Sequence, residues 1–443
     1  MTKTFIIKTL GCKVNQYESE AIANGLQQYG FEWRNINASF AIINTCTVTQ
    51  KAGMQSRQLI RQTIRKHPDA LIIVTGCHAQ INSDDIQAID GVHWIIGHAY
   101  KHELPFRINQ YLTKKQKPDH PQKFISNILA HRSYNHMPLT HLQKRSRPAI
   151  KIQDGCNAFC SYCIVPYARG PARSLPLPDV VNMVVALKKN GYQEIILSGI
   201  HLGLYGHDFT PPIHLSHLLK ALIHIPECPR IRLSSIEPLE ITEELIQILQ
   251  QNKHMCHHLH IPLQSGDNTL LKQMNRHYTR NFFQELVCQI YEQIPDVAIG
   301  IDVLVGFPTE NDPAFENTLS LLKSLPAAYF HVFPFSMRTG TRIASQASPI
   351  DSKTIQARAK AVRELGIQKK KAFMQSCMGQ KQWVLIESSL RDHSQGLTGN
   401  YIPVEIAGHY EKNQLVPVRL KHVLDCNKVT GEIINVETHG CAP

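Results

Sequence analysis

The sequence predicts a mixed α/β protein with three parts: an N-terminal Rossmann-like parallel α/β domain, a central partial (β/α)6 barrel and a small C-terminal β-barrel. Short apolar runs alternate with helical patterns over the first hundred residues, and this alternation resumes six times after Pro148. Short alternating strands follow Gly379. Because a chain of 443 residues exceeds one ordinary domain, two or three are expected. We place them at 1–105, 148–377 and 378–440, with a linker over 106–147.

In the first domain we expect strands and intervening helices at Thr4–Thr9, Glu18–Tyr29, Phe40–Asn44, Lys51–Lys66, Leu71–Thr75 and His93–Ile96. A cysteine follows each of the first three strands, namely Cys12, Cys46 and Cys77. Because the carboxyl ends of parallel strands share one edge, these thiols are predicted to converge on one metal cluster. Three unrelated buried cysteines are the alternative. A mononucleotide site is disfavoured, because the turns lack a Gly-x-Gly-x-x-Gly pattern.

A second cysteine group, Cys156, Cys160 and Cys163, follows the first expected strand of the barrel at C-x3-C-x2-C spacing. No fourth local ligand follows, whereas structural zinc sites use four ligands, usually in two pairs. Three cysteines on a [4Fe–4S] cluster leave one iron open, and that iron can chelate the amino and carboxylate groups of S-adenosylmethionine (SAM). The spacing is typical of the radical-SAM superfamily; a zinc knuckle or a chance grouping is the alternative.

Six strand–helix units with right-handed crossovers predict an open partial barrel with its site at the carboxyl ends of the strands. The expected strands are Ala149–Gln153, Glu194–Ser198, Arg230–Ser234, His258–Pro262, Ala298–Val305 and Tyr329–Phe335. Residues just past these strands are candidate SAM contacts, although turn chemistry also explains them: Ser198, Gly199, Glu237, Gln264, Ser265 and Gly306. Within the cysteine loop, Tyr162 is expected to pack along SAM or the cluster. Arg169 and Arg173 are candidates for the SAM carboxylate or a phosphate.

A dense run of potential metal ligands, His254, Cys256, His257, His258 and His260, invites a different interpretation. On a strand, His258 and His260 share one face while His257 points to the other. The run therefore does not close easily on one ion, and we do not predict a metal site there.

Composition points to a polyanionic partner. The net charge of +12 and the pI near 9.1 favour RNA. A basic helix expected over Gln356–Phe373 either lies on RNA or is a solvated face, and small terminal barrels frequently contact nucleic acid. We expect no signal peptide and no membrane span. Twelve cysteines without an export signal indicate a reducing compartment, the cytoplasm.

Several motifs resemble the radical-SAM methylthiotransferases over almost the whole chain. The matching segments are Thr9–Gln16, Asn44–Thr47, Thr75–Cys77, Gln153–Cys156, Ile164–Gly170, Pro262–Gly266 and Val305–Pro308. The terminal barrel, whose strands are expected at Trp383–Glu387, Tyr401–Ile406, Leu415–Leu420 and Glu432–Val436, resembles a TRAM domain, most clearly at Asn400–Val404. The residues after the first two cysteines, Lys13–Gln16 and Thr47–Thr49, resemble the branch that acts on threonylcarbamoyladenosine in tRNA.

The resemblance implies two [4Fe–4S] clusters, one on Cys12, Cys46 and Cys77 and one on Cys156, Cys160 and Cys163. It implies that SAM is used twice, as methyl donor and as radical source, to place a methylthio group on carbon 2 of the adenine at tRNA position 37. The expected partners are the anticodon stem-loop and an electron donor such as flavodoxin or ferredoxin, with the chain acting as a monomer. The alternatives are isopentenyladenosine or a ribosomal-protein side chain as substrate, or a non-catalytic iron–sulfur RNA-binding protein.

Overall fold

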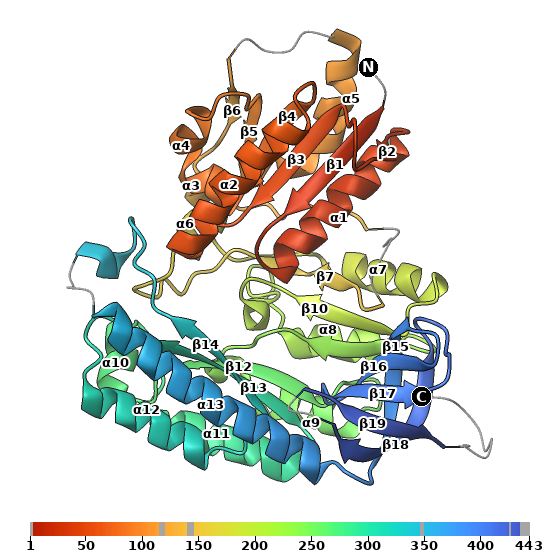
Figure 1. Cartoon of the computed structure of the whole chain (residues 1–443), viewed down its shortest axis with the longest axis vertical. Coiled ribbons are helices and arrows are strands. Elements are labelled where there is room, and N and C mark those ends of the chain that lie inside the picture. The colour runs from red at the N-terminus through yellow and green to blue at the C-terminus, as the bar shows by residue number, and fades with distance from the viewer. Residues whose placement is uncertain (1–2, 115–119, 140–145, 346–349, 425–426, 435–443) are drawn as a thin grey trace. The chain divides into compact units, whose positions relative to one another are not determined.

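A computed structural model describes residues 3–114, 120–139, 146–345, 350–424 and 427–434 (Figure 1). The chain forms two compact units, and each is discontinuous in sequence. Unit 1 comprises Met1–Leu142, Gln153–Leu175 and Ser336–Ser345. Unit 2 comprises Gln143–Ile152, Pro176–Phe335 and Gln346–Pro443.

Unit 1 is built on a parallel sheet of strand order β2-β1-β3-β4-β5-β6, which confirms the predicted parallel α/β domain. Its strands are β1 (Thr4–Thr9), β2 (Glu32–Trp33), β3 (Phe40–Thr45), β4 (Leu71–Gly76), β5 (Trp94–Ile96) and β6 (Gln122–Phe124). Its helices are α1 (Lys13–Gln28), α2 (Gln50–Lys66), α3 (Cys77–Ile81), α4 (Ser83–Gln87), η1 (His98–Glu103), α5 (Leu104–Lys114), η2 (Ile128–Ala130), α6 (Val165–Arg169) and η5 (Arg342–Ser345). A two-stranded antiparallel ribbon completes it, formed by β8 (Gln153–Asp154) and β9 (Arg173–Ser174).

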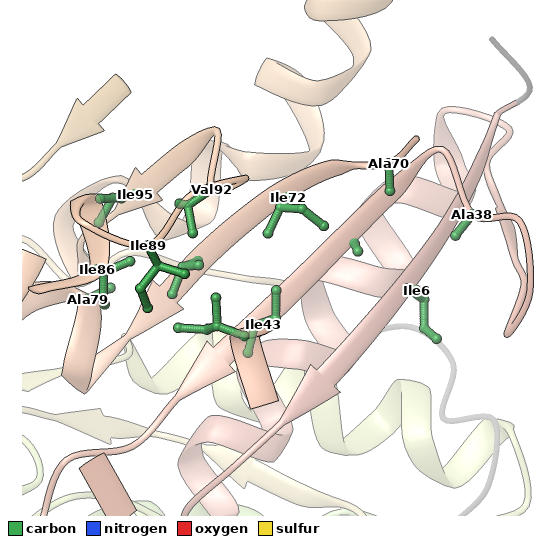
Figure 2. Close-up of a cluster of buried hydrophobic side chains, with 13 residues drawn as sticks. Ile6, Ala38, Ile43, Ala70, Ile72, Ala79, Ile86, Ile89, Val92 and Ile95 are labelled. Atoms are coloured by element: carbon green, nitrogen blue, oxygen red, sulfur yellow. The ribbon is translucent and has the colours of Figure 1, made fainter. Parts of the chain in front are cut away.

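Apolar side chains cover both faces of this sheet, because β3 and β4 are buried along their whole length. On one face, Ile43 and Ile72 pack in a cluster with Ile60 of α2 and Ile86 of α4 (Figure 2). On the other face, the Phe40 ring packs edge-on against Tyr111 of α5. A sheet buried on both faces is typical of parallel strands covered by crossover helices, and the carboxyl ends of β1, β3 and β4 lie at the same edge.

Two sequence predictions for unit 1 differ from the structure, namely the start of the first helix and the extent of the linker. Helix α1 begins at Lys13, five residues before the expected start, because the polar residues of its first turn carry no apolar periodicity. Part of the stretch expected to be a linker is regular structure: α5 occupies its beginning, and β6 pairs in parallel with β5. The side chains of β6 are not alternately apolar, which is why the sequence pattern does not reveal this edge strand.

Unit 2 contains the expected six parallel barrel strands in two sheets, β11-β10-β7 and β12-β13-β14. Parallel bridges from Ile231 to Met255 and from Ser235 to His260 join the two sheets. The strands are β7 (Ala149–Lys151), β10 (Glu194–Ser198), β11 (Arg230–Leu233), β12 (His258–Gln264), β13 (Ala298–Val305) and β14 (Tyr329–Pro334). The strand order follows the sequence, as in an open partial barrel. The expected first strand is shorter than predicted, because residues 153–154 turn away into β8.

The helices of unit 2 lie between and after these strands. They are α7 (Leu177–Lys189), η3 (Leu202–Leu204), α8 (Leu215–Ile223), η4 (Pro238–Glu240), α9 (Glu243–Gln251), α10 (Asn268–Gln273), α11 (Arg280–Gln293), α12 (Asp312–Ser324) and α13 (Ser352–Ser376). The predicted basic helix is α13, but part of its charge is structural. Arg358 is buried and pairs with Glu310, and Lys369 donates to the carbonyl oxygens of Lys323 and Leu325.

The C-terminal residues form the predicted small β-barrel, closed in the order β15-β16-β17-β19-β18. Its strands are β15 (Lys381–Ser389), β16 (His393–Thr398), β17 (Pro403–Ala407), β18 (Leu415–Val423) and β19 (Val429–Ile433). The sequence prediction lacks β16, whose polar residues and Gly396 hide its pattern. A Cβ at Gly396 would lie 2.3 Å from the Leu385 carbonyl oxygen, so the close pairing of β16 with β15 requires glycine. The predicted strand Glu432–Val436 ends outside the described residues.

Buried charged side chains link this barrel to the core strands β10 and β11, near their amino-terminal ends. Arg232 donates to the carbonyl oxygens of Thr398 (3.0 Å) and Gly399 (2.9 Å), while its Nε bonds the Glu194 carboxylate at 2.8 Å. Arg230 bonds the same carboxylate at 2.5 Å and the Trp383 carbonyl oxygen at 2.8 Å. Within the described part of the chain, no helix is both long and apolar enough to span a bilayer.

Replacing Glu194 by Gln should destabilise unit 2 and flatten its acid dependence. Burial opposes ionisation, but Arg232, Arg230 and Arg147 lower the pKa of Glu194 from 4.5 to about 2. Its stabilising effect is therefore complete above pH 4.5 and lost as the pH falls toward 2. Because the variant leaves buried arginines without their carboxylate, we expect a loss of about 3–5 kcal/mol at neutral pH. Urea unfolding at pH 7 and in mild acid measures both effects.

The matched control is Glu227→Gln, which removes an exposed partner of Lys188 and should leave unfolding unchanged. A Glu194→Gln protein that unfolds within about 1 kcal/mol of wild type would contradict this account of the attachment.

Candidate functional site

The first three predicted cysteines meet at the carboxyl edge of the unit 1 sheet. Thr45 of β3 pairs with Gly76 of β4, so Cys46 and Cys77 follow directly from paired positions. Gly11 (φ +101°) brings the chain around after β1, and a Cβ there would lie 3.0 Å from the Cys46 Sγ. The geometry therefore brings Cys12, Cys46 and Cys77 together, as the strand-end argument predicts.

The thiols of this first triad influence one another electrostatically. Burial raises the pKa of Cys77 to about 12; Arg169 opposes this, and negative charge on Cys46 and Cys12 adds to it. Burial also raises the pKa of Cys46, again with a contribution from Cys12. Because ionising one thiol makes the next harder to ionise, the triad favours a bound cation that neutralises the thiolates. Such a donor set suits a metal cluster.

The second triad lies in a loop closed on itself after β8. The Cys156 N–H donates to the Gly170 carbonyl oxygen at 3.0 Å, and the Cys163 N–H donates to that of Cys160 at 2.9 Å. All three thiols are partly exposed. A Cβ at Gly155 (φ +75°) would lie 1.9 Å from the Pro171 carbonyl oxygen, so only glycine allows this closure.

Arg169 lies at the centre of a buried network that joins the two cysteine loops. Its Nη1 lies 2.9 Å from Glu18 Oε1 and 2.8 Å from Asp154 Oδ1. Its Nη2 bonds the Asn15 Oδ1 at 2.6 Å. All four side chains are buried. Although burial acts against it, Glu18 and Asp154 raise the pKa of Arg169 well above its usual value. Arg169 therefore stays charged.

Two of the three partners of Arg169, Asn15 and Asp154, hold backbone close to a cysteine. Asn15 Nδ2 donates to the carbonyl oxygens of Leu10 (2.8 Å) and Thr45 (3.1 Å), which precede Cys12 and Cys46. Asp154 Oδ1 accepts from the Gly155 N–H at 2.9 Å, next to Cys156. The expectation that Arg169 contacts a SAM carboxylate or a phosphate is wrong, because this guanidinium is 1% exposed and fully engaged inside the protein. Arg173 is buried as well and donates to the Arg169 carbonyl oxygen.

The candidate SAM residues in unit 2 do follow the barrel strands, but several have structural partners. Glu237 forms an ion pair with Arg276. Ser265 is fully buried and bonds the turn through the Asp267 N–H. A Cβ at Gly306 would lie 2.5 Å from the Ile355 side chain, so glycine makes room there for α13.

The other four candidates lie at a strand end or in the cysteine loop. Gln264 has φ +66° at a bulge in β12, and in the described part of the chain its side chain has no partner. Ser198 and Gly199 end β10, which places a backbone without a Cβ at the strand terminus. Tyr162 is half-buried in the second cysteine loop of unit 1.

In the described part of the chain, the histidines of the run have different ion-pair or hydrogen-bond partners. His257 pairs with Asp296 at 2.6 Å, and His258 Nε2 lies 2.8 Å from the Tyr329 hydroxyl. His260 Nδ1 lies 3.3 Å from the same hydroxyl, and its Nε2 bonds Asp302 Oδ1 at 2.6 Å. His331 approaches the same oxygen at 3.5 Å, so a second, unpredicted group of metal-ligand types occurs across β12, β13 and β14. This group consists of His260 from the histidine run together with Asp302 and His331, which are distant from the run in sequence.

Sequence reasoning missed the residues that join the two cysteine loops. Asn15 and Glu18 lie one turn apart on the buried face of α1, so polar residues on an otherwise buried helix face were the available signal. Lys101, which bonds Glu18 Oε2 at 2.6 Å, carried no comparable signal. Nor did Arg338, whose Nη2 bonds Thr47 Oγ1 at 2.7 Å across 291 positions of sequence.

Comparison with known proteins agrees with this geometry. Residues 150–322 match the model of the radical SAM superfamily, and residues 4–97 match a family described as "Uncharacterized protein family UPF0004". The structure of the radical SAM methyltransferase TsrM from Kitasatospora setae superposes with a TM-score of 0.60 at 15% identity, covering 78% of this chain and 77% of that one. These matches define a radical SAM protein.

The curated relatives place it within that class. The chain is 38% identical to the threonylcarbamoyladenosine tRNA methylthiotransferase MtaB of Bacillus subtilis, over 91% of this chain and 90% of that protein. It is 34% identical to the Aquifex aeolicus MtaB, over 93% and 98% respectively. A Clostridium botulinum tRNA-2-methylthio-N(6)-dimethylallyladenosine synthase is 32% identical over 89% and 88%. The chain belongs to the radical SAM methylthiotransferase family.

Replacing Arg169 by Gln should destabilise unit 1, because Glu18 and Asp154 lose the guanidinium that both contact. Removing one partner of a buried ion pair costs about 3–5 kcal/mol. Chemical unfolding followed by a probe in unit 1, such as fluorescence of Trp94, measures the loss.

Arg173→Gln is the matched control, since the nearest carboxylate oxygen lies 3.9 Å from that guanidinium. We expect a smaller loss for this variant. Equal losses of unfolding free energy for the two variants would show that the contacts of Arg169 with Glu18 and Asp154 contribute no more to stability than those of Arg173.

Proposed function

We propose that this protein is a tRNA methylthiotransferase that places a methylthio group on carbon 2 of N6-threonylcarbamoyladenosine at position 37. The observation that carries the proposal is the presence of two cysteine triads on one compact unit, joined by the Arg169 network. The relatives named for this reaction support it, since the first of them covers nine-tenths of the chain.

In this proposal six thiolates hold two [4Fe–4S] clusters. Cys12, Cys46 and Cys77 hold one, and Cys156, Cys160 and Cys163 hold the other. Three thiolates per cluster leave one iron open for a ligand that the protein does not supply. When bound, the clusters supply the electron that splits SAM and a place for the sulfur that is transferred. The chain itself supplies the strand ends and the Arg169 network, which hold the thiols at fixed positions.

We also propose which residues contact SAM. Gln264 is the best supported, because its unpaired amide stands at a strand end in a strained backbone conformation. Ser198 and Gly199 offer backbone groups at a terminus without a bulky side chain, and Tyr162 offers a ring inside the cysteine loop. The remaining three candidates act more indirectly, by holding the turns after the strands. Glu237 does so by pairing with Arg276, and Ser265 by accepting from the Asp267 N–H. Gly306 leaves room for Ile355.

The reaction determines the partners. Replacement of the C2–H bond by a C2–S–CH3 group takes a sulfur donor, one SAM as methyl donor and a second SAM as radical source, which carries the C2 hydrogen away as 5′-deoxyadenosine. An external one-electron donor such as flavodoxin or ferredoxin is therefore needed. The net charge of +12 favours binding of the anticodon stem-loop. We propose that the chain acts as a monomer in the cytoplasm, where tRNA is modified.

Nucleoside mass spectrometry of tRNA from a strain that lacks this gene tests the function. The methylthio group on threonylcarbamoyladenosine should be absent, and expression of the wild-type chain should restore it. Cys77→Ala should fail to restore it, because the triad loses one ligand. Cys228→Ala, at a buried cysteine outside both triads, should restore it fully.

A mark that persists in the deletion strain would contradict the proposal. A methylthio group lost from dimethylallyladenosine instead would assign the substrate of the Clostridium relative. Absence of 5′-deoxyadenosine release from SAM under reducing conditions would favour a non-catalytic iron–sulfur RNA-binding protein.

A further inference from the structure

Four residues of unit 1 surround a small open space next to the first cysteine triad, which we call the Gly53 recess. A Cβ at Gly53 would lie 3.7 Å from Thr47 Oγ1, 3.7 Å from His78 Cε1 and 3.8 Å from Arg338 Nη1. Thr47 follows Cys46 and His78 follows Cys77, whereas Arg338 comes from the segment after β14. Because residue 53 is glycine, a space of about one methyl group remains among three polar side chains.

Two buried nitrogen atoms at this recess have no hydrogen bond to any described residue. Arg338 Nη2 donates to Thr47 Oγ1 at 2.7 Å, and that hydroxyl lies 3.3 Å from His78 Nδ1. When the Thr47 hydroxyl donates its own proton to Nδ1, the histidine proton is on Nε2, and this is the tautomer that the proposal below uses. Among the described residues, Arg338 Nε and His78 Nε2 are buried without a hydrogen bond, and His78 is only 1% exposed. Asn82, whose Oδ1 is also buried and unpaired, lies close enough to act on the His78 ring, so Arg338 Nε is the clearer unsatisfied donor. Leaving such donors unsatisfied is costly, which indicates a missing acceptor.

Two arginines and one carboxylate act on the recess, so positive charge is in excess: Arg57 and Arg338 lower the pKa of His78, and Asp85 opposes them. Arg57 lies one turn after Gly53 on α2, and neither Arg57 nor Arg338 forms an ion pair with any described residue. Burial lowers the pKa of Arg338, with Cys46 acting against this shift and Arg57 in the same direction. Helix α2 begins at Gln50, so the positive end of its dipole adds to the field. The ligand that fits is an anion with hydrogen-bond acceptors.

A comparison of the substrates named for the relatives indicates which anion could bind in the Gly53 recess. A threonylcarbamoyl group carries a carboxylate and a hydroxyl, whereas a dimethylallyl group carries neither. Carbon 2 and carbon 6 of adenine are both bonded to N1, so an adenine that presents carbon 2 to the Cys46 side brings its N6 substituent close as well. An Arg–carboxylate contact is among the strongest and most directional available.

We propose that Arg338, with His78 and the space left by Gly53, receives the carboxylate of the threonylcarbamoyl group. This inference rests on the proposed function and deepens it, because it makes the recess the part of the protein that selects the N6 substituent. Arg57 contributes charge, and Thr47 orients both donors. An apolar substituent would leave these donors unsatisfied, so the recess disfavours it.

Binding of modified anticodon stem-loops to the cluster-loaded protein, without SAM, tests the recess. One RNA carries threonylcarbamoyladenosine, and the other carries the same group with its carboxylate converted to a carboxamide. We expect the wild type to prefer the carboxylate RNA by about 10- to 100-fold, the range for a hydrogen bond to a charged group. Arg338→Gln should abolish this preference by weakening only the carboxylate RNA.

Two further variants separate the recess from general charge effects. Arg61→Gln removes an exposed arginine from the same helix and should weaken both RNAs equally, so that the preference is kept. Gly53→Ala adds a methyl group within van der Waals distance of all three side chains. It should reduce the preference without unfolding the protein, because alanine favours a helix.

Equal binding of the two RNAs by wild type would overturn the proposal. So would an Arg338→Gln protein that weakens both RNAs equally or keeps the preference. In either case, methylthiolation of the threonylcarbamoyl RNA by the wild type with SAM and a reductant would leave the proposed function standing. No methylthiolation of that RNA, with turnover of a dimethylallyl stem-loop instead, would contradict the function itself.

Discussion

The buried contact of Arg169 with Glu18 and Asp154 is the constraint on which the proposed chemistry depends. The three side chains come from α1, the β8 ribbon and the end of α6, and each is next to a segment that carries cysteines. Lys101 and Arg173 add two further buried cations, so three positive side chains face two carboxylates. The excess positive charge lies beside thiols that must ionise to bind metal, and it favours their thiolate form.

A network of this kind is a poor source of stability but a good source of specificity. Two carboxylates and a guanidinium lose their hydration when they are buried, and hydrogen bonds within the network offset most of that cost. The geometry is well defined, because Arg169 uses both terminal nitrogens on three different partners. These contacts hold the loops that carry the two cysteine triads in fixed positions relative to one another. In unit 2, Glu194 and its arginines connect core strands and C-terminal barrel in a similar way.

Much of this arrangement was predictable because it follows from local patterns. The apolar runs of β1, β3 and β4 are buried on both faces, so their hydrophobicity alone reveals them. Once these are parallel strands, the meeting of Cys12, Cys46 and Cys77 follows from the shared edge. The six barrel strands could be predicted because they too are short apolar runs, and strand β10 has the predicted bounds.

The remaining features depend on contacts between distant residues or on atypical patterns. Strand β16 is half polar and contains Gly396, so its place in a closed barrel is set by neighbours and not by its own sequence. Arg169 looked like a ligand-binding arginine because exposure cannot be read from sequence. The Gly53 recess joins residues 47, 53, 78 and 338, and no pattern connects them before the chain is folded.

The central claim is that this chain holds two separate clusters, one per cysteine triad. Iron and acid-labile sulfide content, measured on anaerobically reconstituted protein, tests it most directly. The account predicts about eight irons per chain for the wild type. It predicts about four when Cys12, Cys46 and Cys77 are all alanine, and about four when Cys156, Cys160 and Cys163 are. A wild-type chain that binds only about four irons, all lost in one of the two variants and none in the other, would contradict it.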